Sequence, residues 1–120
     1  MDARVAATIN TMRLTLGGKL SILDLSRRVN ISPSRLRQLF EKDTGRSPLQ
    51  YLRELRMQQA EHLLTSTFLS IKEVAFRSGV RHVSSFVHDF KTRHGLTPTE
   101  FRTRTGPIRN RSPKTVKPGE

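Results

Sequence analysis

The polar side chains that could carry chemistry recur in two short segments about 50 residues apart. Ser34, Arg37 and Gln38 are spaced to share one side of a helix, and Ser84 and His88 are spaced in the same way. Arg can donate two hydrogen bonds to guanine and Gln can pair with adenine, while Ser and His can contact either bases or phosphate. For any one of these residues alone, an ordinary solvated helix position explains it at least as well. The two sets together, in a basic chain, favour contacts to nucleic acid.

The chain is strongly basic. Its 120 residues contain 22 Lys and Arg against 10 Asp and Glu, a formal net charge of +12. Residues 1–103 hold 17 of the basic and 9 of the acidic residues, so their net charge is already +8. A basic domain favours polyanionic partners, nucleic acid first and an anionic membrane surface second. From composition alone, a cationic protein with a merely solvated face is an equally simple interpretation.

The same sequence offers little for catalysis. Its four His residues form no metal-binding spacing, its acidic residues are scattered, and it contains no Gly-rich phosphate loop. The absence of Cys excludes disulfides and Cys-based zinc sites and is compatible with a reducing compartment. We therefore expect no enzyme activity, no catalytic residue, no metal and no cofactor. No run approaches the ~20 apolar residues that span a bilayer, so we expect no membrane association and a cytoplasmic location.

Apolar residues recur with helical spacing throughout the chain and nowhere alternate as in a strand. This spacing, together with the cap residues, predicts helices over 4–16, from Ser21, over 33–44, over 48–65, from Ser70, over 83–94 and from Pro98. The prediction is an all-α fold of about seven helices. We divide it into a first helix-turn-helix subdomain (1–47), a linker helix (48–65), a second helix-turn-helix subdomain (66–104) and a basic, disordered tail (105–120).

One sequence pattern, F-x4-G-x-[ST]-P, occurs twice, beginning at Phe40 and again at Phe90. In each copy an apolar helix ends at the Gly, and the next helix begins with Ser or Thr followed by Pro. An amide or acidic residue three places after the Ser or Thr completes a capping box. Ser70 and Glu73 predict a further capping box. A twofold repeat of this period indicates two similar supersecondary units.

Each unit combines a short helix, a tight turn and a second helix, and the second helix of such a motif can enter the major groove of DNA. Leu36 and Phe40 define the buried side of this helix in the first unit, and Phe86 and Phe90 define it in the second. The pattern alone is weak, because similar helix corners occur in many proteins that do not bind DNA. The residues that point away or lie on the flanks are Ser34, Arg35, Arg37, Gln38 and Glu41 in the first unit, and His82, Ser84, Ser85, His88, Lys91 and Thr92 in the second.

With these motifs in place, the sequence resembles the DNA-binding domain of AraC/XylS-type transcriptional regulators over about residues 4–103. The matching positions of the first half are Leu25-Ser26, Leu36-x2-Leu39-Phe40, Gly45-x-Ser47-Pro48-x2-Tyr51-Leu52 and Arg56-x3-Ala60-x2-Leu63-Leu64. Those of the second half are Ile71-x2-Val74-Ala75-x3-Gly79 and Phe86-x3-Phe90-Lys91-x3-Gly95-x-Thr97-Pro98-x2-Phe101-Arg102. The ordered run of the second half is much more specific than a single helix-turn-helix.

The resemblance implies two homeodomain-like units whose recognition helices, about 33–44 and 83–94, enter successive major grooves on one face of the DNA. Base contacts would then fall on Ser34, Arg37, Gln38, Val83, Ser84, Ser85 and His88. Phosphate contacts are expected from Arg35, Arg46, Ile71, Lys72, His82 and Lys91, with Arg53 and Arg93 as additions. For Arg56 we give equal weight to a phosphate contact and to an internal ion pair that holds the linker helix. Because Arg37 and Gln38 have no equally strong counterparts in the second set, we expect the first unit to carry more of the base specificity.

The sequence therefore predicts sequence-specific binding of double-stranded DNA by a bacterial-type transcription regulator, with RNA polymerase as a candidate second partner. The alternative is a cationic helical protein that binds nucleic acid or a membrane surface without sequence preference. We disfavour it because the short helices need their apolar faces for the core, and because the few aromatics fall at core positions rather than at exposed stacking positions. We expect the chain to be a fragment of a longer regulator, monomeric by itself and able to dimerise through a separate sensor domain. A small stand-alone regulator is the other interpretation.

Overall fold

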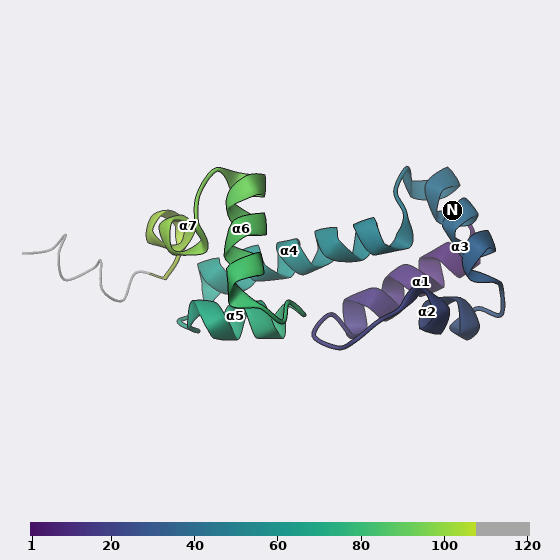
Figure 1. Ribbon diagram of the computed structural model, residues 1–120, viewed down its shortest axis with the longest axis horizontal. Coiled ribbons are helices and arrows are strands. Elements are labelled where there is room, and N and C mark those ends of the chain that lie inside the picture. The colour runs from purple at the N-terminus through teal and green to yellow at the C-terminus, as the bar shows by residue number, and fades with distance from the viewer. Residues whose placement is uncertain (108–120) are drawn as a thin grey trace, which may run out of the picture.

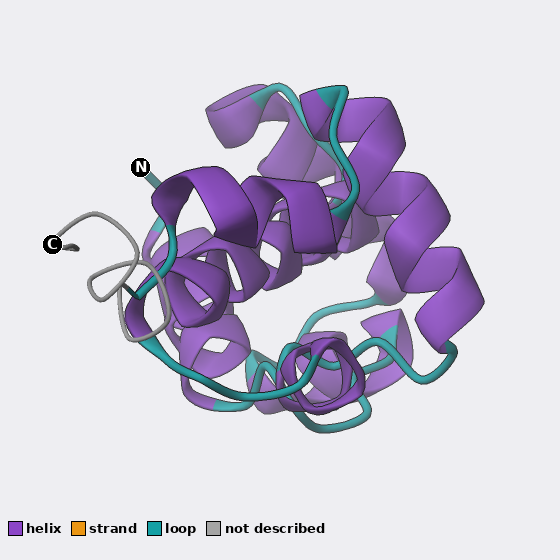
Figure 2. Cartoon of the chain, turned by 90° about the vertical axis from the view of Figure 1, so that its left-hand side faces the viewer, coloured by secondary structure: helices purple, strands orange, loops and turns teal. Residues whose placement is uncertain are grey.

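The computed structural model describes residues 1–107 and is all-α over that part of the chain, as the sequence predicts (Figure 1). Its helices are α1 (Ala3–Leu14), α2 (Ile22–Arg28), α3 (Pro33–Thr44), α4 (Pro48–Ser66), α5 (Ile71–Arg77), α6 (Val83–His94) and α7 (Pro98–Thr105). Figure 2 shows these helices and their connecting loops, with no strand among the described residues. Within the same residues, no helix is both long and apolar enough to cross a membrane. The expected disordered tail begins inside the last turn of α7, and from residue 108 it lies outside the described residues.

Helix α4 is the axis along which the molecule is built. Its N-terminal half packs against α1 and α3, and its C-terminal half packs against α5 and α7 (Figure 1). We call α1–α3 the first unit and α5–α7 the second unit. With 19 residues, α4 is roughly 28 Å long at ~1.5 Å per residue. The two units therefore lie at opposite ends of one continuous helix.

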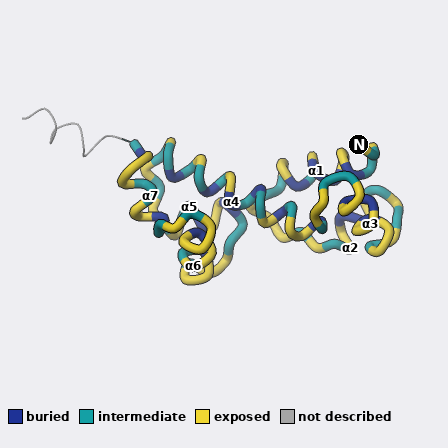
Figure 3. The backbone as a smooth tube through the Cα atoms, turned by 90° about the horizontal axis from the view of Figure 1, so that it is seen from above, coloured by how far each residue is buried: buried dark blue, intermediate teal, exposed yellow. Residues whose placement is uncertain are grey.

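Each unit has its own hydrophobic core, and α4 contributes to both. The first core contains Val5, Ile9, Met12, Leu25, Leu36, Leu39, Phe40, Leu52 and Leu55. The second contains Met57, Ala60, Leu64, Val74, Ala75, Phe86 and Phe90. Figure 3 shows the resulting pattern, in which buried positions recur along each helix between exposed ones. The apolar stripes of the short helices supply both cores, while a few large apolar side chains, among them Leu14 and Phe76, stay exposed.

The two helix-turn-helix corners are built alike. Ser26 and Ala75, each 1% exposed, lie where the two helices of a corner approach, so that only a small side chain fits. Asn30 (φ 59°) and Gly79 (φ 86°) then take the left-handed backbone conformation that turns the chain. The second turn is one residue longer, because α6 begins at Val83 rather than one position earlier. The repeat in the sequence is therefore a repeat in structure.

The repeated F-x4-G-x-[ST]-P stretch forms the exit from α3 and from α6. Gly45 and Gly95 end these helices in the left-handed conformation. The Ser47 hydroxyl accepts from the Gln50 backbone N–H while the Gln50 side chain accepts from the Ser47 N–H, a complete capping box. The equivalent box at the start of α7 is also present, as predicted.

Two local predictions are wrong. Ser70 caps α5 by accepting from the Glu73 backbone N–H, but the Glu73 carboxylate does not complete the box. It accepts instead from Arg77 Nε at 2.9 Å, one helical turn later, and this ion pair competes with the cap. Helix α1 ends at Leu14 and does not reach residue 16. Thr15 leaves the helical conformation, and its hydroxyl donates to the Thr11 carbonyl at 2.7 Å.

Candidate nucleic-acid interface

Helix α3 presents a polar face because its opposite face is locked into the first core. Leu36 and Phe40 are fully buried, which fixes the rotation of the helix about its axis. Ser34, Arg37 and Gln38 are consequently exposed, as the helical phase predicts. Arg35 is exposed beside them, and its Nη1 donates to Gln38 Oε1 at 3.5 Å, a contact at the outer limit for a hydrogen bond. These side chains are available to an external partner.

Helix α6 is positioned in the same way by the second core. Phe86 and Phe90 are fully buried, and their rings lie 5.8 Å apart. Ser84, Ser85 and His88 are exposed, and Val83 is half-buried, so it offers only part of its apolar surface. The structure thus brings each predicted set of base-contacting residues to the surface of one helix.

The side chains of the predicted phosphate contacts are also at the surface, and the contact expected at Ile71 rests on its backbone N–H at the start of α5. The side chains of Arg35, Arg46, Lys72, His82 and Lys91 are exposed. Ile71 is half-buried and packs against the second core, so its side chain is structural and only its backbone N–H can serve a phosphate. At the start of α6, no side chain caps the first turn, because His82 makes no capping hydrogen bond. Phosphate oxygen is a suitable acceptor for such open N–H groups.

A hollow of about 700 Å³ between the two units gathers further cations. Lys19, Arg53 and Arg81 line it, together with His82 and Ser85 from the start of α6. Lys19 and Arg81 were not predicted from the sequence, because they are 62 positions apart and only the packing of the units brings them to one hollow. A signal was nevertheless present, since each directly follows one of the chain's turn segments. One acidic residue, Asp89, lines the same hollow.

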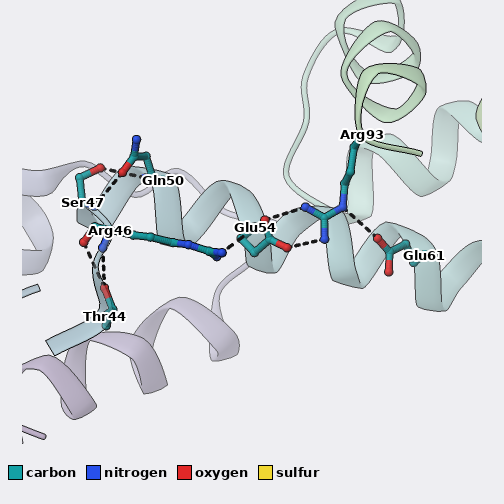
Figure 4. A network of polar contacts seen from close by, with 7 residues as sticks. All are labelled: Thr44, Arg46, Ser47, Gln50, Glu54, Glu61 and Arg93. Atoms are coloured by element: carbon teal, nitrogen blue, oxygen red, sulfur yellow. Dashed lines mark hydrogen bonds and ion pairs between the residues drawn. The ribbon is translucent and has the colours of Figure 1, made fainter. Parts of the chain in front are cut away.

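Arg93, predicted as an additional phosphate contact, lies at the surface but is held by two carboxylates of α4 (Figure 4). Its Nη1 donates to Glu54 Oε1 at 2.6 Å, its Nη2 donates to Glu54 Oε2, and its Nε donates to Glu61 Oε2 at 3.2 Å. Arg46 approaches Glu54 Oε1 at 3.9 Å from the other side and stays exposed. The charge of Arg93 is therefore balanced by two carboxylates of α4, which makes Arg93 less suited to bind a phosphate than a cation without such partners.

The Arg93 guanidinium lowers the pKa of Glu54 below its ordinary value of 4.5, mainly through the hydrogen bonds between them. A carboxyl whose pKa is lower in the folded than in the unfolded state stabilises the fold above the unfolded pKa. That stability is lost as the pH falls through the folded pKa. Acidification below about pH 4.5 should therefore weaken the contact between α4 and α6.

We predict that Glu54→Gln lowers the free energy of unfolding at pH 7 by about 1 kcal/mol, because the pair is partly exposed. The loss should shrink as the pH falls from about 4.5 through the lowered pKa of Glu54, because Glu54 of the unmodified chain then becomes neutral as well. Urea denaturation at a series of pH values measures this. Glu41→Gln, the same change at an exposed carboxylate of α3, is the control and should stay within about 0.5 kcal/mol. A pH-independent difference for Glu54→Gln would show that the ion pair contributes nothing.

The side chain of Arg56 forms internal hydrogen bonds to backbone carbonyls, in place of the internal ion pair that was one of its two predicted contacts. Its guanidinium is half-buried and donates to the backbone carbonyls of Leu16 and Gly18. Arg102 of α7 acts similarly, since its guanidinium donates to the carbonyls of Leu64, in α4, and of Leu69, in the loop before α5. Burial lowers the pKa of both groups. One Arg thus holds the loop before α2, and another holds the loop before α5.

The prediction that the aromatics occupy core positions is only partly right. Phe40, Phe86 and Phe90 are fully buried, but Phe76 is 69% exposed and Phe68 is 53% exposed. Phe76 lies in α5 directly after the buried pair Val74 and Ala75, where the helical phase points outward. Phe76 therefore presents an exposed ring of the kind that can stack on single-stranded nucleic acid, which the sequence did not predict.

Residues 25–104 match a family model described as a helix-turn-helix domain. The HTH-type transcriptional activator RhaR of Cronobacter sakazakii is 35% identical over 105 residues, which cover 84% of this chain and 37% of that protein. An AraC-type DNA-binding domain-containing regulator from Chromobacterium violaceum has a structure with 26% identity and a TM-score of 0.80, covering 85% of this chain and 91% of that one. The DNA-binding domain of AdpA, solved in complex with a target DNA, shares 27% identity at a TM-score of 0.82, covering 94% and 99%. The chain spans 31–37% of the length of the first curated relatives it matches.

Proposed function

The chain belongs to the AraC-type family of helix-turn-helix DNA-binding domains of transcription regulators, and we propose that it binds double-stranded DNA with sequence preference, placing α3 and α6 in successive major grooves. The observation that carries the proposal is the pair of exposed polar faces on α3 and α6, each fixed by its own core and both attached to one helix. The length of α4, roughly 28 Å at ~1.5 Å per residue, is comparable with the ~34 Å between successive major grooves on one face of DNA.

Within this proposal, the side chains divide into two classes. Arg37 and Gln38 of α3 and Ser84, Ser85 and His88 of α6 read base edges, with Ser34 and Val83 at the ends of the two faces. Arg35, Arg46, Lys72, His82 and Lys91 bind phosphates, joined by Lys19, Arg53 and Arg81 around the hollow between the units. The exposed positions of these side chains and the net charge of +8 over residues 1–103 support this division. Asp89 would accept from a base amino group or repel phosphate from this part of α6.

Selection of bound sequences from random duplex DNA is the experiment that tests the proposal. We expect two conserved submotifs about 10 base pairs apart, one helical turn of DNA. A selection that enriches no sequence, with equal binding of all duplexes, would instead support the sequence-independent cationic alternative. Binding to anionic vesicles at the same ionic strength distinguishes the membrane version of that alternative.

We also predict a steep dependence of the affinity on salt. The logarithm of the association constant should fall with the logarithm of the salt concentration by about 0.9 per neutralised phosphate. Five or more phosphate contacts thus give a slope of about −4.5 or steeper. Fluorescence anisotropy titrations of a selected duplex between low and physiological salt measure this slope. A slope near −1 would show that most of the exposed cations lie away from the DNA.

The remaining features of the whole regulator stay predictions. Because the chain spans about a third of its curated relatives, the effector, dimerisation through a separate sensor domain and contacts to RNA polymerase are properties of a longer protein. We propose the bacterial cytoplasm as the compartment in which this domain would meet DNA.

A further inference from the structure

The two units touch each other directly beside the middle of α4. Arg56, in the ninth position of α4, reaches the loop between α1 and α2. Its Nε donates to the Leu16 carbonyl at 3.3 Å and its Nη2 donates to the Gly18 carbonyl at 2.9 Å. The loop of the first unit is therefore held at the centre of α4, next to Met57, where the second core begins. A guanidinium suits this task, because its planar donors can serve two carbonyls at once.

The second unit meets this loop through Gly79, in the turn of its helix-turn-helix. A Cβ at position 79 would lie 2.2 Å from the Leu16 carbonyl oxygen and 2.6 Å from Arg56 Nε. A Cβ at Gly17 would likewise lie 3.2 Å from the Arg77 carbonyl oxygen. Backbone of the first unit, backbone of the second unit and a side chain of α4 are thus in close contact at one point.

The other turn glycines make this contact stand out. Gly45 and Gly95 have the same left-handed conformation as Gly79, with φ of 76° and 74° against 86°. A Cβ at either of them would meet nothing within 4 Å. Gly45 and Gly95 therefore serve only their local turns, whereas Gly79 also leaves room for the Leu16 carbonyl of the first unit. All three positions need glycine for the backbone conformation of the turn, but only position 79 also needs it for the contact between the two units.

A second polar link between the units lies along α4. Arg46 precedes α4 at the exit of α3, and Arg93 belongs to α6, yet both approach the carboxylate of Glu54 (Figure 4). The exit of the first recognition helix and the side of the second one are therefore connected through one α4 residue. Neither unit is attached to the other by α4 alone.

We propose that Arg56, Gly79 and residues 16–18 form a joint that sets the separation and the angle between α3 and α6, so that the chain binds its two half-sites at one spacing only. This inference rests on the proposed function and identifies the residues that determine which spacing between the two DNA half-sites the chain accepts. Moving one half-site by one base pair shifts it by ~3.4 Å and rotates it by about 35° around the DNA axis. If the joint is rigid, α3 and α6 cannot both follow the moved half-site, and base contacts are lost. If the joint is flexible, the two units can move and keep those contacts.

Duplexes in which the two half-sites are moved apart or together by one and two base pairs test the joint. The unmodified chain should lose about tenfold or more in affinity per base pair of displacement, as for one lost base contact. Arg56→Met, which keeps an apolar stem and removes both hydrogen bonds, should reduce that loss to about threefold or less while leaving the affinity for isolated half-sites unchanged. Arg13→Met, the same change at an exposed position of α1, should behave as the unmodified chain. If Arg56→Met weakens half-sites and all spacings by one common factor, the joint is refuted.

A measurement without DNA separates this inference from the proposed function. The chain contains no Cys, so spin labels at Arg28→Cys and Thr99→Cys, one exposed site in each unit, report the distance between the units. The distribution of distances between the two labels should be narrow when Arg56 is present and clearly broader with Arg56→Met. Arg56→Lys replaces Arg56→Met if that variant folds poorly. Gly79→Ala should shift or broaden it, whereas Gly45→Ala, with the same backbone strain and no clash, should not. Unchanged distributions in all variants would overturn the joint, whatever the DNA selection shows, and absence of sequence preference would overturn the proposed function alone.

Discussion

Replacing Phe90 by Ala should lower the free energy of unfolding of the second unit by about 3–5 kcal/mol, the range for removing a large aromatic side chain from a packed core. Phe90 is fully buried, and its ring lies 5.2 Å from that of Phe101 and 4.2 Å from that of His94. The ring therefore joins α6 to α7 as well as to α4. Its loss opens a cavity at the point where the recognition helix is fastened.

The effect should be confined to one end of the molecule, because the two cores share no buried residue. Amide hydrogen exchange of Phe90→Ala should show lost protection in α5–α7 and nearly full protection in α1–α3. Phe40→Ala, at the equivalent buried position, should give the reverse pattern. Phe76→Ala, at a position that is 69% exposed, is the control and should change stability by about 0.5 kcal/mol or less. Protection lost equally at both ends would show that the units unfold as one cooperative body.

The helices and their rotation could be predicted from the sequence because the information is local. Apolar spacing, Ser-Pro and Thr-Pro helix starts and turn glycines act within a few residues, and each of them agrees with the others. Leu36, Phe40, Phe86 and Phe90 were therefore placed on the buried side correctly, and the outward direction of Arg37 and His88 followed. The capping box at Ser70 failed because a second local partner, Arg77, competed for the same carboxylate.

The partners of the Arg side chains could not be predicted in this way. Arg93 meets Glu54 and Glu61 across 39 and 32 positions of sequence, and Arg56 meets Gly18 across 38. A long, flexible and always charged side chain finds its partner only after the backbone has folded. The same holds for Lys19 and Arg81, which become neighbours of one hollow through the contact between the units. The sequence therefore could not show which cations are paired within the fold and which ones the packing of the two units brings together.

Replacing Arg37 by Ala should weaken binding of the selected duplex by about 1–3 kcal/mol, roughly 5- to 150-fold, and should relax the base preference at one position of the first submotif. Arg37 is exposed in the middle of α3, and no carboxylate or carbonyl is seen to hold its guanidinium within the described residues. Gln38→Ala should act at a neighbouring position of the same submotif, with an effect in the same range. Repeating the selection with each variant, and titrating both the selected and a scrambled duplex, measures the change in specificity.

The comparison with α6 decides how the specificity is divided. His88→Ala removes the outward side chain of α6 that corresponds to Gln38 in the repeat. Its neighbours Ser84 and Ser85 are small and offer fewer directed hydrogen bonds than Arg or Gln. We therefore expect His88→Ala to cost less than Arg37→Ala on the same duplex, with relaxation confined to the second submotif. Arg13→Ala removes an exposed charge from α1 and is the control for the effect of net charge on the affinities of Arg37→Ala and His88→Ala. If Arg37→Ala weakens selected and scrambled duplexes equally, Arg37 binds phosphate rather than a base. If His88→Ala proves the more damaging to specific binding, α6 is the main reader, and the hydrogen-bonding capacity of exposed side chains is a poor guide to where this chain reads its DNA.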